Sequence, residues 1–247
     1  MSTEIITYIF AALIAVISLS VHEYSHARAA DLLGDPTARN MGRMTLNPLS
    51  HLDPFGAICL VLFHFGWAKP VPVNGRNFRK PKRDFALTAM AGPLSNLLLG
   101  FFGALIFLLF RRFALSVTVS GAFAFNLLSY TLLFLYLFHM LNLGLALFNL
   151  LPIPPLDGSR LLSALLPDRL YYRLMRYERV IYWVMVAWLI FGDLVAERLL
   201  ALTGAAPGTF LYVFCRILSL SGLISDAVGI VSGWFLAFWE LIPFLRV

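Results

Sequence analysis

The stretch IITYIFAALIAVISLSVHEYSH occupies residues 5–26 and joins an apolar run to a group of ionisable side chains. Its first part, residues 5–21, contains no Asp, Glu, Lys or Arg. A helix needs about 20 apolar residues to cross the ~30 Å hydrocarbon core of a bilayer. The stretch therefore predicts a transmembrane helix over residues 4–30, with polar chemistry at its C-terminal end.

The rest of the chain has the same apolar character. Of its 247 residues, 60% are hydrophobic and 13% are charged, whereas ordinary soluble domains carry about 25% charged residues. Uncharged runs recur at residues 97–110 and 127–141. We therefore expect an all-α polytopic protein of the cell membrane, with three core helices over residues 4–30, 85–110 and 121–151.

The C-terminal part predicts two or three further membrane helices. Residues 180–200 and 227–245 are long enough to span, whereas residues 209–224 form a shorter apolar run that predicts either a sixth span or an interfacial segment. We expect a core domain over residues 1–170 and additional transmembrane helices over residues 171–247.

A segment rich in proline and glycine separates the first two core helices. Its density of Pro and Gly between residues 31 and 84 excludes a long helix. Residues 55–67 are largely apolar but too short to span, which favours a re-entrant or interfacial piece. Residues 68–74 alternate valine with proline and predict an extended or edge strand.

The basic residues predict the orientation in the membrane. The chain has a net charge of +6, but no pattern typical of nucleic-acid binding, so we interpret its basic residues as topology signals. Nine Lys or Arg lie within residues 28–83 and five within residues 160–179, whereas the loop between the second and third helices contains only Arg111 and Arg112. The first two regions are therefore expected on the cytoplasmic side. The first helix, which lacks a basic leader, is expected to be retained rather than cleaved.

His22-Glu23-Tyr24-Ser25-His26 matches the pattern H-E-x-x-H. Because four residues make about one helical turn, both imidazoles face the same way. In this pattern the imidazoles bind zinc and the glutamate takes a proton from water. Ionisable groups at the end of a membrane helix usually mark a functional site. The alternative is a His-Glu-His cluster solvated at the membrane interface.

A zinc site of this kind needs a third protein ligand. His26 is followed by Ala-Arg-Ala-Ala-Asp, so the pattern with a third histidine shortly downstream is absent. The sequence NLLPIPPLDG at residues 149–158 offers Asp157 instead. Its prolines end the third helix, and irregular backbone at membrane depth is tolerated only inside protein or beside a cavity. Asp157 is expected on the same side as His26; its alternative role is to cap a helix over residues 158–166.

The two motifs together resemble those of the site-2 protease family of intramembrane zinc metalloproteases. Residues 149–158 match every position of the family pattern N-x-x-P-x-P-x-L-D-G. The resemblance implies that one zinc ion per chain is bound by His22, His26 and Asp157. It also implies that Glu23 is the general base and that Asn149 helps to stabilise the oxyanion, a role suited to a side-chain amide in a dry site.

Two further segments extend the resemblance to about residues 5–170. The segment from Gly34-Asp35 to Gly56 is similar to a bacterial, compact branch of the family, and neither a PDZ nor a CBS domain fits in the chain. Ala91-Gly92-Pro93-Leu94-Ser95-Asn96 resembles the family feature G-P-x-x-N. This resemblance implies that Asn96 binds an unwound substrate; the alternative is an interhelical hydrogen bond.

The expected activity is hydrolysis of a peptide bond within or near a transmembrane segment of another membrane protein, with the lipid bilayer as the second partner. Residues 68–74 are expected to pair with the unwound substrate by strand addition. A non-proteolytic zinc-binding scaffold or chaperone, and a transporter, are the alternatives. Three other histidines, His51, His64 and His139, are weighed as ligands and considered poorer candidates than Asp157.

Overall fold

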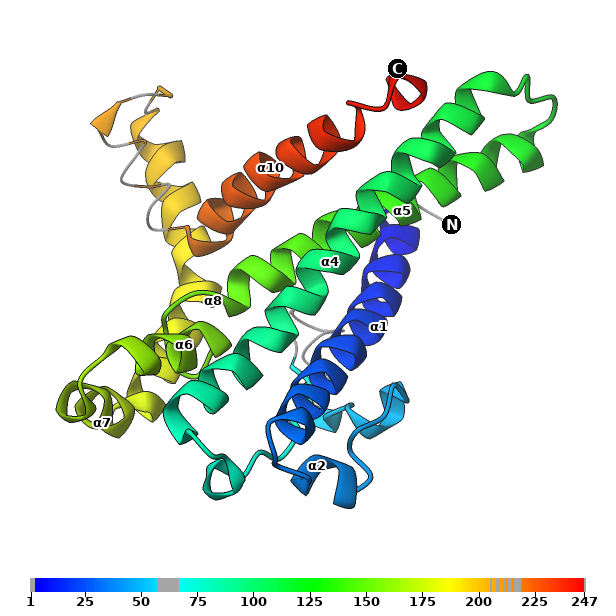
Figure 1. Ribbon diagram of the computed structural model, residues 1–247. Coiled ribbons are helices and arrows are strands. Elements are labelled where there is room, and N and C mark those ends of the chain that lie inside the picture. Colours follow the sequence, from blue (N-terminus) through cyan, green and yellow to red (C-terminus); the bar gives the residue numbers. More distant parts are fainter. Residues whose placement is uncertain are drawn as a thin grey trace.

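The computed structural model describes residues 3–56, 67–204 and 219–246, together with residues 206, 207, 209, 210, 212 and 215. Within this part of the chain, five helices are long and apolar enough to cross a membrane (Figure 1). They are α1 (Thr3–Leu32), α4 (Pro81–Ser116), α5 (Ala122–Asn149), α8 (Glu178–Thr203) and α10 (Leu220–Trp239). The expected all-α polytopic membrane protein is confirmed.

Several helices are longer than the sequence predicts. Helix α4 begins at Pro81, whose missing N–H is no loss in the first turn of a helix. It continues past Arg111 and Arg112 to Ser116 because long basic side chains can extend to the membrane surface without ending a helix. The last span begins at Leu220 rather than near residue 227. Residues 57–66 of the short piece expected at 55–67, and residues 211, 213, 214 and 216–218 of the run at 209–224, lie outside the described residues.

Helices α1, α4 and α5 form the core. Helix α4 packs against both α1 and α5, and the three lie side by side in Figure 1. Small residues bring α4 close to α5: a Cβ atom on Gly100 would lie 2.9 Å from a methyl carbon of Leu143. Such close approach is the usual source of helix association in lipid, where apolar burial alone gives little.

A buried histidine ties the additional helix α10 to this core. His139 on α5 is fully buried, and its Nδ1 donates to the carbonyl of Gly100 on α4 at 2.7 Å. Its Nε2 lies 2.8 Å from the hydroxyl of Ser232 on α10. Polar contacts of this kind give buried polar groups the hydrogen-bond partners that lipid cannot provide. His139 therefore has a packing role at a distance from the metal-ligand candidates.

Short elements fill the segments between the membrane helices. They are α2 (Thr37–Asn40), η1 (Pro48–Ser50), η2 (Gly75–Asn77), α6 (Asp157–Leu165), α7 (Asp168–Arg176) and η3 (Pro243–Leu245). The strand expected at residues 68–74 is not formed; among the described residues the segment has a single antiparallel bridge, between Leu52 and Ala68. Pro70 and Pro72 have no N–H, so a ladder cannot continue through them. We call residues 68–74 the strap.

The strap, α2 and α6 gather at one end of the bundle, where α1 and α5 also end (Figure 1). The chain termini lie toward the opposite end of the α4–α5 pair. The candidate residues of α1, α5 and α6 therefore lie near helix ends that the fold brings together, whereas Asn96 lies inside α4.

Candidate active site

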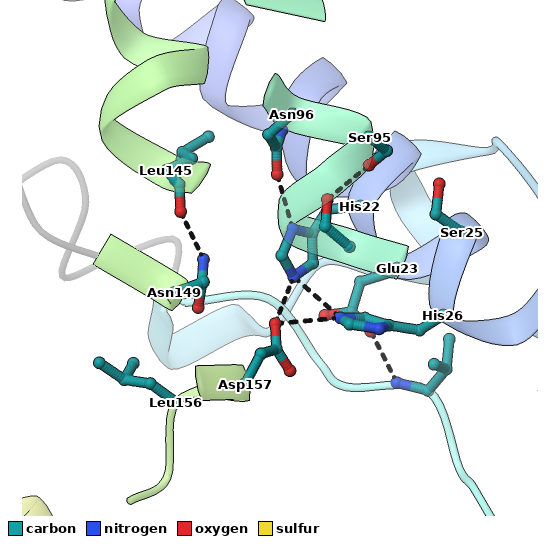
Figure 2. A network of polar contacts seen from close by, with 12 residues as sticks. His22, Glu23, Ser25, His26, Ser95, Asn96, Leu145, Asn149, Leu156 and Asp157 are labelled. Carbon is teal, nitrogen blue, oxygen red and sulfur yellow. Dashed lines mark hydrogen bonds and ion pairs between the residues drawn. The ribbon is translucent and has the colours of Figure 1, made fainter. Parts of the chain in front are cut away.

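His22, His26 and Asp157 meet at this end of the bundle (Figure 2). The Nε2 atoms of His22 and His26 lie 3.1 and 3.2 Å from Oδ2 of Asp157. The two Nε2 atoms lie 2.9 Å from each other. These ligand atoms all fall within 4.8 Å of one another, although the carboxylate comes from a residue 135 positions beyond His22. The three residues thus form one compact group that can hold a metal ion.

Asp157 reaches the histidines because α6 begins directly below the end of α5. A Cβ atom on Gly158 would collide with the carbonyl oxygens of Leu150 and Leu151, so only glycine permits this approach. The capping alternative is wrong: the N-cap residue is Leu156, and the helix has no side-chain cap. The carboxylate of Asp157 supplies an oxygen ligand, which zinc accepts beside two imidazoles.

The outer nitrogens of both imidazoles are bound by acceptors. His26 Nδ1 donates to the backbone carbonyl of Thr88 at 2.7 Å. His22 Nδ1 lies 2.6 Å from Oδ1 of Asn96, whose amide nitrogen donates to the oxygens of Ser18 and Asn142. These bonds place the protons on Nδ1 and leave the Nε2 lone pairs facing Asp157. Two lone pairs and a carboxylate that converge on one point need a cation between them, and the donor set fits zinc.

Gly92 on α4 provides the room for this group. A Cβ atom there would lie 2.5 Å from Nε2 of His22 and even closer to Nε2 of His26. Any side chain at residue 92 would therefore displace both imidazoles.

Replacing Gly92 by Ala is expected to remove most of the bound zinc from the purified protein, because both imidazoles must move to admit the methyl group. Metal analysis of detergent-solubilised protein measures the effect. Gly144→Ala on α5 is the matched control, since the nearest atom to a new Cβ there is 4.0 Å away. Equal zinc in the two variants would contradict this account of Gly92.

Asn96 is fully buried, and its amide bridges three helices. It contacts His22 and Ser18 on α1 and Asn142 on α5. The structure favours the interhelical alternative of the sequence analysis, with one addition: the bridge includes a candidate ligand. Direct binding of substrate by Asn96 stays a prediction.

Removing the Asn96 amide is expected to weaken zinc binding by about 10–100-fold, the usual effect of losing a partner behind a metal ligand. The measurement is competition of Asn96→Ala against a zinc chelator. Ser95→Ala serves as control, because the Ser95 hydroxyl donates to the carbonyl of Gly92 rather than to a ligand. An affinity equal to that of Ser95→Ala would show that Asn96 does not orient His22.

Glu23 and Asn149 line the same cleft as the three ligands. The cleft has a volume of about 550 Å³, and its other walls include Trp67, Phe148 and Tyr182. Glu23 is buried, and its Oε2 accepts a hydrogen bond of 2.8 Å from the backbone N–H of Val71. A larger hollow of about 710 Å³ at the far end of the α4–α5 pair contains none of the candidate residues, so we assign no chemistry to it.

The amide of Asn149 stands at the last turn of α5. Its Nδ2 donates to the carbonyl of Leu145 at 2.9 Å, and it has a second hydrogen that this bond does not use. The location in the cleft is compatible with the expected role at an oxyanion, which stays a prediction.

Two of the three other histidines lie away from the ligands. His51 donates from Nε2 to the carbonyl of Thr45 at 2.8 Å and braces its own loop. His139 lies between α4 and α10, as described above. His64 lies outside the residues that the structure describes. Within the described part of the chain, His22, His26 and Asp157 are the group of residues able to share a metal ion.

Three contributions to the site escape sequence reasoning. The carbonyl of Thr88 and the N–H of Val71 are backbone groups, which any residue possesses, so no residue type signals them. Gly92 belongs to the segment that resembles G-P-x-x-N, but its role depends on the distance between α4 and α1.

Fold and site together define a multi-pass membrane protein with a buried His-His-Asp group that can hold a metal ion. The family description "Peptidase family M50" matches residues 10–192. The chain belongs to this family of metalloproteases, and the resemblance to site-2 proteases is confirmed.

Two curated relatives carry related names. "Putative zinc metalloprotease YwhC" of Bacillus subtilis (strain 168) is 44% identical over 163 residues, which cover 66% of this chain and 72% of that relative. "Putative zinc metalloprotease Rip2" of Mycolicibacterium smegmatis is 33% identical over 150 residues, which cover 58% of this chain and 52% of that relative. No solved structure matches the chain.

Proposed function

We propose that this protein hydrolyses a peptide bond within or near a transmembrane segment of another membrane protein, using one zinc ion held by His22, His26 and Asp157. The observation that carries the proposal is the convergence of these three ligands beside Glu23, at the end of an apolar helix bundle. The names of the relatives support zinc as the metal.

Each residue has a chemical task in this proposal. When bound, zinc polarises the peptide carbonyl and lowers the pKa of water. Glu23 accepts a proton from the attacking water and returns it to the departing amine. The free hydrogen of the Asn149 amide donates to the oxygen that becomes negative. A non-proteolytic scaffold would need the ligands but not the base, so the presence of Glu23 in the cleft favours the protease.

The substrate segment has to unwind before it reacts. A peptide bond inside a helix is shielded by its own hydrogen bonds and by neighbouring side chains. The cleft of about 550 Å³ has apolar walls such as Phe148 and Tyr182, which suit the side chains of an unwound transmembrane segment.

The strap remains our candidate for pairing with the unwound substrate. Pro72 has no N–H group, so the substrate would donate its own N–H group to the strap carbonyl at that position. Because Arg43 already binds the carbonyls of Lys69 and Pro70, such pairing would be limited to the C-terminal part of the strap.

The proposed site opens toward the cytoplasm. The Lys and Arg side chains within residues 28–83 and 160–179 support this orientation, because basic residues are enriched in cytoplasmic loops. We also propose that residues 1–170 form the catalytic core and that residues 171–247 add transmembrane helices around it.

The proposal is tested by mapping new chain ends in membranes. Cells expressing the wild type or Glu23→Gln are compared by mass spectrometry of terminal peptides. We expect ends inside transmembrane segments in the wild-type sample only. Identical sets of ends in the two samples would overturn the proposed activity.

A further inference from the structure

The strap touches the proposed base at its middle residue. The Val71 N–H donates to Oε2 of Glu23 at 2.8 Å, and Glu23 itself is only 8% exposed. A carboxylate with one oxygen bound in this way has the plane of its carboxyl group fixed. The second oxygen can then be directed toward water in the cleft.

A frame formed by residues 34–56 holds the N-terminal end of the strap. The N–H of Lys69 donates to the carbonyl of His51 at 2.8 Å. The guanidinium of Arg43 donates to the carbonyls of Lys69 at 2.8 Å and of Pro70 at 3.3 Å. These bonds leave the strap little freedom just before Val71.

Asp35 holds the C-terminal end of the strap. Its carboxylate is fully buried, with one oxygen accepting the N–H of Asn74 at 2.7 Å and the other accepting the amide of Asn77 at 2.7 Å. Its own N–H donates to the carbonyl of Ala30, so it is fixed to the end of α1. Burial would raise the pKa of Asp35, but hydrogen bonds from Thr37, Asn77 and Asn74 outweigh it and lower the pKa.

One helix therefore supports both partners of the Glu23 contact. Helix α1 carries Glu23 directly, and through Asp35 at its end it also holds the strap three residues after Val71. Because both ends of the strap are bonded to the frame, the arrangement is a fixed support rather than a mobile lid.

We infer that the frame is a positioning device for the general base: through Asp35 and Arg43 it holds the strap so that the Val71 N–H orients Glu23. This inference gives the Gly34-Asp35 and Gly42-Arg43 elements of the sequence a task in catalysis. The expected effect of the frame on kcat rests on the proposed function.

The first test removes the Val71 donor with little other change. Val71 precedes Pro72 and is already restricted to extended conformations, which proline also adopts. On a transmembrane substrate identified by the end mapping above, Val71→Pro is expected to lower kcat by roughly 10–100-fold. The zinc content is expected to stay unchanged.

Val73→Pro is the matched comparison: it also removes an N–H group from the strap beside the cleft, but not the one bonded to Glu23, so its kcat is expected to fall less than that of Val71→Pro. A role of the strap in pairing with substrate would appear as a raised KM in both variants. Equal values of kcat for Val71→Pro and Val73→Pro would overturn the inference.

The second test asks whether Asp35 acts through the strap, without any need for activity. In Asp35→Asn an amide nitrogen must face either the Asn74 N–H or the donors of Thr37 and Asn77. Hydrogen exchange in strap peptides is therefore expected to become about tenfold faster. The control, Asp31→Asn, removes an equal charge that pairs with Arg28 and Arg39 instead.

Exchange in Asp35→Asn equal to that in Asp31→Asn would overturn the inference. If the protein is active, Asp35→Asn should also cause no further loss of kcat in the Val71→Pro background, and an additive loss would count against the shared route. A wild type that cleaves nothing would remove the proposed function, whereas the exchange comparison would still decide whether the frame holds the strap.

Discussion

Replacing Glu23 by Gln is expected to lower the rate of substrate cleavage by at least about 10²–10⁴-fold, the usual contribution of a general base. The amide has nearly the shape of the carboxylate but cannot accept a proton from water. Glu23 is not among the three ligands, so zinc should stay at one ion per chain. Cleavage of a reconstituted transmembrane substrate and metal analysis of the same sample measure the two effects.

Glu240→Gln is the control for this prediction, because Glu240 ends α10 and lies outside the cleft. A Glu23→Gln protein that retains wild-type cleavage would exclude Glu23 as the base. If the wild type cleaves nothing and Glu23→Gln keeps the biological activity of the wild type, the zinc-binding scaffold is favoured instead.

Removing the carboxylate of Asp157 is expected to have the second large effect. Loss of a residue that hydrogen-bonds to a metal ligand typically weakens zinc binding by roughly 10–100-fold. Loss of a direct ligand should weaken zinc binding by more than that. Two imidazoles alone do not make the three protein ligands of a catalytic zinc site. The purified Asp157→Ala protein should therefore contain little zinc and show no cleavage.

The control for Asp157 is a carboxylate within a candidate membrane helix. Asp193 on α8 accepts hydrogen bonds of 2.6 Å from the hydroxyls of Ser219 and Ser221, and it is not one of the three candidate ligands. Asp193→Ala should keep its zinc. Unchanged zinc in Asp157→Ala would remove this residue from the ligand set.

Local sequence patterns predict much of this fold and site. The spacing of His22 and His26 gives one shared helix face, because a turn contains 3.6 residues wherever the helix lies. The apolar runs give the membrane helices, since the bilayer fixes their length. The NLLPIPPLDG motif at residues 149–158 signals both the end of α5 and the carboxylate of Asp157.

Other features depend on distances that no local pattern contains. Asn96 resembles a substrate-binding residue in sequence, but packing of α4 against α1 turns its amide toward His22. The valine-proline alternation of the strap predicts a strand, yet its prolines cannot donate to a ladder, and its middle N–H instead meets Glu23. The sequence predicts that the second core helix ends at residue 110, before Arg111 and Arg112. Helix α4 continues to Ser116, because charged residues at the membrane surface do not stop a helix.

The claim that α1 and α6 together form one zinc centre is tested most directly by X-ray absorption at the zinc edge of the purified wild type. We predict one zinc per chain with two imidazole nitrogens at about 2.0–2.1 Å and oxygen ligands at about 2.0–2.2 Å. The oxygen contribution should change in Asp157→Ala. A wild type without zinc, or a spectrum that is identical in Asp157→Ala, would contradict the account.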